Sequence, residues 1–328
     1  MADIKDRWGK KPALTVWVLT DGKIGDDVQG LAVAKALTIA VDKKVIAPRA
    51  PWSWLAPWGP IDPRDNPKSP ESPINGEPPD IVIASGRRAI PYARVVKAAS
   101  KGRTLVVILK DPRAGYKMAD FIWAPTHDRL RGDNVFSTLT SPHPLAGKLD
   151  LAARNPVKAI ADLRHPLLGV VLGGPSGGAR YGTAEAVALA ANLQSAAKNF
   201  AALAVTPSRR TPDAFLQSLR SGLPQENLFF WDGNGENPYL DILSSADTLV
   251  VAADSHNMMS EAMATGTGVY AYRPPGLAAK MEWFVKELEK SGAIRPLSSN
   301  ISSFSVEPVD ATPEIVAEII KRLGPAAG

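Results

Sequence analysis

The sequence predicts an α/β fold of two Rossmann-like domains that face a cleft, each a parallel sheet flanked by helices. At 328 residues the chain is too long for one ordinary hydrophobic core. Short, almost continuously apolar runs alternate with helical patterns, which is typical of parallel sheets covered on both faces. A unit of strand, glycine-rich loop and helix occurs near the start of the chain and again halfway along it.

In the first half, a strand is predicted at 14–19 (LTVWVL) and, after the polar loop TDGKIGDDVQG, the apolar spacing predicts a helix at 31–40. The segment PPDIVIASGRRAIPYARVVKAASKGRTLVVILKDPR then predicts strand, helix and strand. The intervening segment 48–79 is dense in proline, which excludes regular helix or central strand and predicts a long surface loop.

The proline-rich loop carries Trp52, Trp54 and Trp58. These side chains either pack back on the domain or form a wedge at a membrane surface, where tryptophan is favoured. Arg49 and Arg64 nearby would favour anionic lipid.

In the second half, a strand at 168–172 leads through GGPSGGARYG into an alanine-rich helix at 183–200. SADTLVVAADSHNMMSEAMATGTGVYAYRPP predicts strand, turn, helix and strand. A last helix opens with Thr312 as N-cap and Pro313 at its first position. The expected division is an N-terminal domain at 1–155, a C-terminal nucleotide-sugar domain at 156–311, and a helix at 312–328 that packs back on the N-terminal domain.

Composition narrows the function. The net charge is +5 and no run of Lys and Arg resembles a nucleic-acid arm, so no nucleic-acid partner is expected. The absence of cysteine excludes disulfides and thiolate chemistry. No apolar run approaches the roughly 20 residues that span a bilayer, and the first residues lack a signal-peptide core, which predicts a cytoplasmic protein.

The glycine-rich loop of the second half is a candidate anion site. Its glycines let backbone N–H groups approach a ligand, and the following helix N-terminus adds partial positive charge. Tight-turn geometry alone is the alternative reason for the glycines. The loop is neither GxGxxG nor a P-loop, so no tightly bound cofactor is expected. The residues expected to meet a diphosphate are Gly173, Gly174, Ser176, Gly177 and Arg180.

ADSHNMMSEAMATG places polar residues where a strand gives way to a helix. If Asp254 or Ser255 caps that helix, the backbone around Asn257 and Met258 would face a second anionic oxygen. Glu261 lies one turn further on, where its carboxylate can accept two hydrogen bonds from a vicinal diol such as a ribose. A solvated helix carboxylate is the alternative, but the small, apolar neighbours of Glu261 favour a binding role.

Further polar residues follow the apolar strands of the first half, and the carboxyl ends of strands are where open α/β sheets bind ligands. Asp26 belongs to an acidic loop in which neighbouring carboxylates can raise one another's pKa and so supply a general base. An acidic loop that merely caps a helix is the alternative. The expected substrate-binding residues are Gly25, Gln29, Ser85, Gly86, Arg87, Lys110, Arg113 and His127.

Metal and hydrolase sites are disfavoured. The four histidines show no H-x-x-x-H spacing, so no metal is expected. No G-x-S-x-G elbow is present either, which argues against a Ser-His-Asp hydrolase.

Several ordered motifs resemble known families. GLAVAKAL, VLGGPSGGA and DSHNMMSEAMATGTGVYAY resemble GT-B glycosyltransferases, notably the N-acetylglucosaminyltransferase that acts on the peptidoglycan lipid intermediate. VWVLTDGKIGDDVQGLAVAKAL, KDPR, APTHDRLRGDNV and VLGGPSGG are together similar, over nearly the whole chain, to the mitochondrial fission family named for elongated mitochondria. Bacterial members of that family are sometimes labelled nucleoside-diphosphate-sugar epimerases.

The resemblance implies roles for single residues. Gly173, Gly174, Ser176 and Gly177 would meet the donor diphosphate, and Glu261 the ribose. Aligning GLAVA with the same letters of the lipid-intermediate enzyme puts Asp26 where that enzyme has a histidine, which makes Asp26 the candidate base. Ala253 stands where retaining enzymes carry a second Glu, so the resemblance implies inversion of the sugar's configuration.

The sequence therefore predicts a GT-B-like, inverting glycosyltransferase that takes a sugar from a nucleoside-diphosphate donor, of UDP type, to a lipid-linked or envelope glycan acceptor. Two alternatives stay open: a non-hydrolysing nucleoside-diphosphate-sugar epimerase, and a non-catalytic membrane-associated adaptor like the eukaryotic fission relatives. The expected location is the cytoplasm, with peripheral attachment to the inner face of the membrane through the tryptophan loop.

Overall fold

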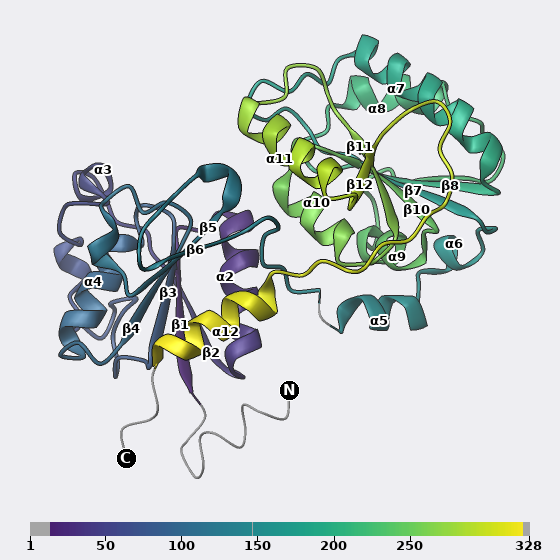
Figure 1. Cartoon of the computed structure of the whole chain (residues 1–328). Coiled ribbons are helices and arrows are strands. Elements are labelled where there is room, and N and C mark those ends of the chain that lie inside the picture. Colours follow the sequence, from purple (N-terminus) through teal and green to yellow (C-terminus); the bar gives the residue numbers. More distant parts are fainter. Residues whose placement is uncertain (1–13, 146, 324–328) are drawn as a thin grey trace. The chain divides into compact units, whose positions relative to one another are not determined.

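The computed structural model describes residues 14–145 and 147–323. The chain forms two compact units, drawn in Figure 1. Unit 1 comprises the described residues up to Pro144 and those from Ala311 onward, and unit 2 is Leu145–Asp310. Each unit contains a six-stranded sheet with helices on both faces.

The sheet of unit 1 is parallel throughout, in the order β2-β1-β3-β4-β5-β6. Strand β2 therefore lies on one side of β1, and β3 to β6 follow in chain order on the other side. The strand order reverses between β1 and β3, and this reversal is where open sheets bind ligands. The strands are β1 (Thr15–Thr20), β2 (Ala40–Val45), β3 (Ile81–Ser85), β4 (Leu105–Leu109), β5 (Phe121–Pro125) and β6 (Val135–Thr138).

Alternating side chains of β1 face the two helical layers of unit 1. Val16 and Val18 pack towards α2 (Ile24–Leu37) and α12 (Thr312–Leu323), while Trp17 and Leu19 pack towards α4 (Ile90–Ala99). Figure 1 labels these three helices and β1. Complete burial of side chains of this size contributes about 1.5–3 kcal/mol each. The remaining elements of unit 1 are short: α3 (Trp52–Leu55) and the 3-10 turns Pro63–Asp65, Tyr116–Met118 and Thr126–Asp128.

Helix α2 begins earlier than the apolar spacing predicted, at Ile24 rather than 31. Asp26 and Asp27 fall in its first turn, where carboxylates are favoured by the helix dipole. The helix also lies very close to β1, because a Cβ placed on Gly30 would be 3.0 Å from Val18 Cγ1. Most of the expected polar loop is therefore helix, and the predicted end of that helix is strand β2.

The sheet of unit 2 is also parallel, in the order β12-β11-β10-β7-β8-β9. Its strand order reverses between β7 and β10. The strands are β7 (Leu167–Val171), β8 (Ala202–Thr206), β9 (Leu228–Phe230), β10 (Thr248–Ala252), β11 (Gly268–Tyr272) and β12 (Ile294–Pro296).

Helices cover both faces of this second sheet. One layer packs around Leu168, Val170 and Val250 and contains α7 (Thr183–Ala196) and α8 (Asp213–Ser221). The other layer contains α9 (Tyr239–Ser245), α10 (His256–Met263) and α11 (Ala279–Lys290). Two short helices precede the sheet, α5 (Lys148–Arg154) and α6 (Lys158–Ala161).

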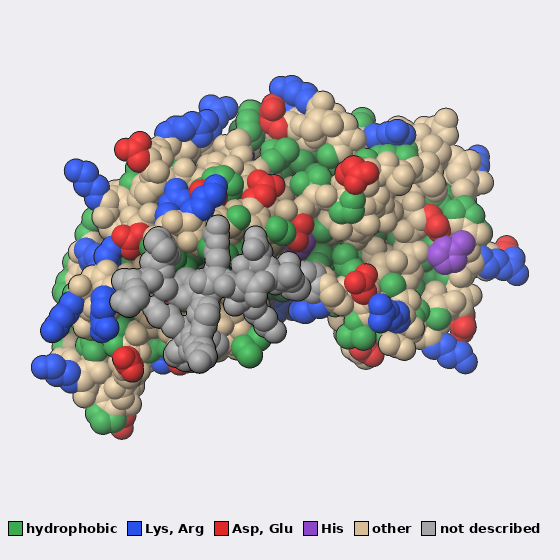
Figure 2. All heavy atoms as spheres, turned by 60° about the horizontal axis from the view of Figure 1, so that its bottom comes forward, with side chains coloured by type: hydrophobic (Ala, Val, Ile, Leu, Met, Phe, Trp, Pro, Cys, Tyr) green, Lys and Arg blue, Asp and Glu red, His purple; other side chains and the backbone are tan. Residues whose placement is uncertain are grey.

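The units divide at Pro144, earlier than the expected boundary at 155, because α5 packs against α9 and so belongs to unit 2. Helix α12 packs on α2, β4 and β5, with Ile315 and Ile319 fully buried. Among the described residues no helix is long and apolar enough to cross a bilayer. On the face shown in Figure 2, acidic and basic side chains are interspersed rather than gathered by sign.

Candidate functional site

The glycine loop (residues 173–178) and the start of α10 lie at the strand-order reversal of unit 2. The loop follows β7 and the helix follows β10, and these two strands are hydrogen-bonded neighbours. From them the chain proceeds to opposite sides of the sheet, so their carboxyl ends are the place where the fold leaves room for a ligand.

Asp254 holds the glycine loop in place. Its side chain is completely buried and both of its oxygens have partners inside the protein. Tyr181 donates its hydroxyl to Oδ1, at 2.5 Å, while the Gly174 N–H (3.2 Å) and Arg210 (3.3 Å) donate to Oδ2. A Cβ on Gly173 would lie 1.8 Å from Oδ1, so that position requires glycine. Asp254, predicted as a ligand contact, thus has a structural role in shaping the loop.

The tip of the loop is exposed and rests on the turn after β11. Ser176 and Gly177 are exposed. Gly178 has a φ of +100° and its added Cβ would lie 2.9 Å from the Gly276 carbonyl oxygen, so close backbone packing as well as turn geometry requires this glycine. Arg180, predicted as an anion ligand, pairs through Nε with Glu185 at 3.2 Å.

Helix α10 is capped by Ser255, one of the two residues that the sequence offered for that role. The Ser255 hydroxyl accepts a hydrogen bond from the Met258 N–H at 3.4 Å. Met258 and Asn257 are half-buried in the first turn of the helix. The positive end of the α10 dipole therefore lies beside the glycine loop, where it would stabilise an anion.

Glu261, one turn into α10, accepts a hydrogen bond from the hydroxyl of Tyr239 at the start of α9. Burial raises the pKa of Glu261, and the Tyr239 hydrogen bond and the charge of Lys148 oppose that rise. Burial and the neighbouring carboxylate raise the pKa of the Tyr239 hydroxyl well above its ordinary value. Glu261 is therefore a half-buried carboxylate that accepts a hydrogen bond from a hydroxyl group.

An aromatic pocket of about 370 Å³ adjoins this pair at the carboxyl end of β9. One of its lining residues, Pro238, directly precedes Tyr239, the hydrogen-bond partner of Glu261. The Trp231 indole N–H donates to the Asn234 carbonyl at 2.8 Å, which fixes the ring at the pocket wall. The lining residues are Val157, Ala159, Phe229, Phe230, Trp231, Asp232, Asn234, Glu236 and Pro238.

In unit 1, the structure brings Asp26 and Lys110 together. Lys110 Nζ lies 2.6 Å from Asp26 Oδ1. Lys110 has a φ of +74°, a left-handed conformation that is strained for a residue with a side chain, and its N–H donates to the Trp123 carbonyl at 2.6 Å. Strain of this kind collects at functional sites.

Other acids of the same strand edge also have partners. Asp27 accepts a hydrogen bond from the Thr20 hydroxyl and pairs with Lys43 at 2.5 Å. Asp21 pairs with Lys23 through Oδ2 at 3.0 Å, and its carboxyl group would lie 3.2 Å from a Cβ on Gly86. The predicted residues after β1 and β3 therefore meet at the reversal of the unit 1 sheet.

The remaining predicted residues of unit 1 are spread over neighbouring loops. Gly25 and Gln29 lie on α2, with Gln29 buried, and Arg87 is exposed beyond β3. Arg113 has a φ of +54° and its N–H donates to Asp111 Oδ1 at 2.8 Å, while His127 lies 3.7 Å from Asp128. Within the described part of the chain, no three His, Asp or Glu side chains gather where they could hold a metal ion.

The proline-rich loop is ordered around the buried Asp62, and some of its aromatic side chains are exposed. Asp62 is fully buried and accepts hydrogen bonds from Arg49 and Arg64, whose donation holds the pKa of its carboxyl well below the ordinary value. Arg94 donates to the carbonyls of residues 57, 58 and 59. Trp52 is half-buried beneath Arg49. The exposed residues, called here the tryptophan patch, are Trp54 (72% exposed), Leu55 (48%) and Trp58 (68%).

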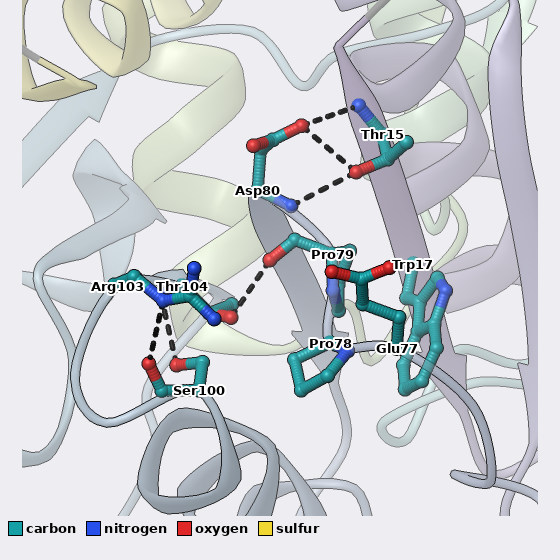
Figure 3. A pocket seen from close by; sticks show the side chains of 9 residues that line it. All are labelled: Thr15, Trp17, Glu77, Pro78, Pro79, Asp80, Ser100, Arg103 and Thr104. Atoms are coloured by element: carbon teal, nitrogen blue, oxygen red, sulfur yellow. Dashed lines mark hydrogen bonds between the residues drawn. The ribbon is translucent and has the colours of Figure 1, made fainter. Parts of the chain in front are cut away.

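A second pocket of about 370 Å³ lies at the opposite, amino edge of the unit 1 sheet (Figure 3). Its polar groups are used to join strand starts: Asp80 accepts from both the N–H and the hydroxyl of Thr15, and Thr104 donates to the Pro79 carbonyl. Among the described residues, no buried side-chain atom that lacks a hydrogen-bond partner belongs to the lining of this pocket. The arrangement indicates a structural role.

Four site residues of unit 2 escaped sequence reasoning: Tyr181, Arg210, Trp231 and Tyr239. Tyr181 and Arg210 reach the site through long-range contacts, both with Asp254 and Arg210 also with the Pro175 carbonyl, so no local pattern marks them. Trp231 had a local signal, because an aromatic run followed by DGNGENP is typical of a strand that ends in a turn.

Comparison with known proteins identifies a family and related folds. The sequence model of the family described as "Mitochondrial fission ELM1" matches residues 24–323. The mitochondrial fission protein ELM1 of Arabidopsis thaliana is 28% identical over 273 residues, covering 75% of this chain. The match spans 64% of the Arabidopsis protein, so this chain corresponds to less than two thirds of that relative.

Two solved structures share the fold at low sequence identity. UDP-GlcNAc 2-epimerase from Neisseria meningitidis, solved bound to UDP-GlcNAc, is 12% identical with a TM-score of 0.51, and the match covers 94% of this chain and 91% of that one. A UDP-glucosyltransferase from Polygonum tinctorium is 12% identical with a TM-score of 0.50 and coverage of 96% and 94%. These likenesses confirm the predicted GT-B-like α/β fold.

Replacing Asp254 with Ala should destabilise the protein by about 3 kcal/mol, because the Gly174 N–H and the Tyr181 hydroxyl would be left buried without an acceptor. Urea denaturation measures this. The control is Arg180→Ala, whose exposed ion pair with Glu185 should be worth no more than about 1 kcal/mol. Equal losses in the two variants would contradict the structural role of Asp254.

The raised pKa of Glu261 predicts a pH-dependent effect of Glu261→Gln. A carboxyl group with a raised folded-state pKa binds its proton more tightly in the folded state, so its stabilisation is present at low pH and is lost as pH rises through the folded pKa. The melting temperature of the wild type, relative to Glu261→Gln, should therefore fall as the pH rises above about 4.3, the ordinary pKa of a glutamate. Thermal unfolding across that range measures it; a constant difference would contradict the burial of the charge.

Proposed function

The chain belongs to the mitochondrial fission ELM1 family, and we propose that it binds a nucleoside-diphosphate sugar at the strand-order reversal of unit 2 and transfers the sugar to an acceptor hydroxyl. The observation that carries the proposal is the meeting of three elements there: a glycine loop pinned by Asp254, the N-terminus of an eight-residue helix, and Glu261 one turn in.

Each part of such a donor has a complementary element. The diphosphate would lie against the loop tip at Ser176 and Gly177 and the positive end of α10, since backbone amides and a helix dipole favour anions. The ribose diol would replace the Tyr239 hydroxyl as the donor to Glu261. The base would enter the aromatic pocket beside Trp231, where its ring can stack on an aromatic wall.

Transfer requires stabilisation of the leaving diphosphate and a base for the acceptor hydroxyl. Fixed amides and a helix dipole at the diphosphate supply the first without reorganisation during the reaction. Asp26 is the base that the family resemblance offers, and the ammonium group of Lys110 lies 2.6 Å from its carboxylate. Catalysis would then rest mainly on positioning and electrostatics.

Epimerisation of the same donor is the alternative reaction at this site. It would use the donor-binding elements of unit 2 and need no acceptor, which distinguishes it from transfer in a product analysis. A Neisseria meningitidis protein with the same fold, a UDP-GlcNAc 2-epimerase, supports this alternative by fold alone.

The tryptophan patch supports a second function, attachment to an anionic membrane surface. Trp54, Leu55 and Trp58 are exposed on a loop that Asp62 and Arg94 hold in shape. Tryptophan is favoured at the boundary between headgroups and hydrocarbon, and Arg49 and Arg64 nearby would interact with anionic lipid. A lipid-linked acceptor, or a role as a membrane adaptor without catalysis, would both use this surface.

Nucleoside diphosphates should raise the melting temperature of the wild type and fail to do so for Glu261→Gln. A ligand present at about 100 times its Kd stabilises the folded state by roughly 2.7 kcal/mol. The measurement is a thermal-shift panel with UDP, GDP, CDP, TDP and ADP, and UDP is expected to give the largest response.

The matched control for that panel is Glu226→Gln, an exposed glutamate of the same unit away from the reversal. It should respond to nucleotide as the wild type does. A wild type that no diphosphate stabilises, or a Glu261→Gln variant that responds fully, would contradict the proposed donor site.

The double variant Trp54→Ser/Trp58→Ser should bind vesicles of phosphatidylglycerol and phosphatidylcholine at least roughly tenfold more weakly than the wild type. Burying one large apolar side chain contributes about 1.5–3 kcal/mol, which is tenfold or more in affinity. Vesicle sedimentation measures the difference. The control is Val187→Ser, which removes an exposed apolar side chain of unit 2 and should bind vesicles as the wild type does. If the double variant also binds as strongly as the wild type, the tryptophan patch is not the membrane-binding surface.

A further inference from the structure

Among the residues that the structure describes, two buried oxygens at the strand-order reversal of unit 1 have no hydrogen-bond partner. They are Oδ1 of Asp21, which follows β1, and Oγ of Ser85, which ends β3. The two strands are neighbours, and Ser85 is paired in register with Thr20, the residue before Asp21. Buried polar atoms are nearly always paired in native proteins, so two unpaired oxygens at one ligand-binding position require an explanation.

The backbone makes room for the Asp21 carboxyl group. Gly86 has a φ of +84°, and a Cβ there would lie 3.2 Å from each of the three carboxyl atoms of Asp21. The carboxyl group therefore lies flat against the backbone of the β3 turn, next to Ser85. A glycine at this position lets the carboxyl group of Asp21 approach the residue that follows Ser85 in the chain.

Asp21 differs in this respect from the other acids of the loop. Asp26 is paired with Lys110, and Asp27 is paired with both Thr20 and Lys43. Asp21 has one partner, Lys23, on one of its oxygens, and the Lys23 side chain is 68% exposed. Because the Lys23 side chain is exposed and contacts only Oδ2, Oδ1 of Asp21 stays available to accept a hydrogen bond from a ligand.

We propose that Asp21 and Ser85 form a hydroxyl subsite, in which Asp21 rather than Asp26 is the base that deprotonates the acceptor. The catalytic part rests on the proposed glycosyl transfer. The acceptor hydroxyl donates to Asp21 Oδ1 and accepts from the Ser85 hydroxyl. As its oxygen bonds to the anomeric carbon, the bond from that carbon to the diphosphate breaks, the diphosphate leaves with the electron pair, and the proton passes to Asp21.

The subsite also predicts an effect on stability that a structural role would not produce. A carboxylate and a hydroxyl kept unpaired for a ligand destabilise the empty protein, so Asp21→Asn and Ser85→Ala should melt at or above the temperature of the wild type. Thr20→Val is the matched control. It removes a neighbouring buried hydroxyl that does have partners, Asp27 and the Gly22 N–H, and should lower the melting temperature.

The experiment measures two quantities on the full chain: melting temperature without ligand, and release of UDP from UDP-GlcNAc with water as acceptor. The subsite is supported if Asp21→Asn and Ser85→Ala melt no lower than the wild type while Thr20→Val melts lower. The role as base is supported if Asp21→Asn releases UDP at least roughly 100-fold more slowly, the smallest usual effect of a general base, and Asp26→Asn loses less.

The result that overturns the subsite is a fall in melting temperature for Asp21→Asn or Ser85→Ala as large as that of Thr20→Val. Release of UDP by Asp21→Asn at the wild-type rate, or no release by a wild type that UDP stabilises, overturns the role as base. If no diphosphate stabilises the wild type, the proposed function fails and the role as base with it. The melting temperatures, read without nucleotide, still decide whether the subsite exists.

Discussion

Reversal of strand order in two parallel sheets is the constraint on which both candidate sites depend. In a parallel sheet every strand ends at the same edge, and successive helices cover the ends of their own strands on one face or the other. Only where the order reverses do two neighbouring strands send their chains in opposite directions. The reversal lies between β7 and β10 in unit 2 and between β1 and β3 in unit 1. The glycine loop with α10, and Asp21 with Ser85, occupy these two positions.

An aspartate follows a strand at each reversal, but the two carboxylates differ in how many of their oxygens have hydrogen-bond partners. Asp254 is fully buried and its two oxygens accept three hydrogen bonds, so it defines the shape of the glycine loop. Asp21 is nearly as buried but leaves one oxygen without a partner. A buried carboxylate without a partner is less favourable in free energy than a paired one. The fully paired Asp254 therefore has a structural role in unit 2, whereas Asp21 in unit 1 keeps an oxygen that can accept a hydrogen bond from a ligand.

Features that depend on a local residue pattern could be predicted from the sequence, whereas features that depend on contacts between distant residues could not. Buried strands such as β3 and β10 are nearly continuous apolar runs, and Ser255 follows one of them in the position that predicts an N-cap. Strand β2 was missed because AVDKKV is mostly polar, as an edge strand allows. Tyr239 could not be predicted, since its partner Glu261 lies 22 residues away on another helix. The start of α2 was placed too late because polar, glycine-containing residues form its first turns.

The exposure of the tryptophan side chains in the proline-rich loop is informative because the loop backbone itself is ordered. Aromatic side chains on a loosely held loop can fold back onto the protein, so their exposure alone carries little information. Here the loop is fixed from beneath by the fully buried Asp62 and by Arg94, which donates to three successive carbonyls. Trp52 does pack back, under Arg49, whereas Trp54 and Trp58 are turned outward by the same ordered backbone. The exposure of Trp54 and Trp58 therefore belongs to an ordered loop, as the proposed binding surface requires.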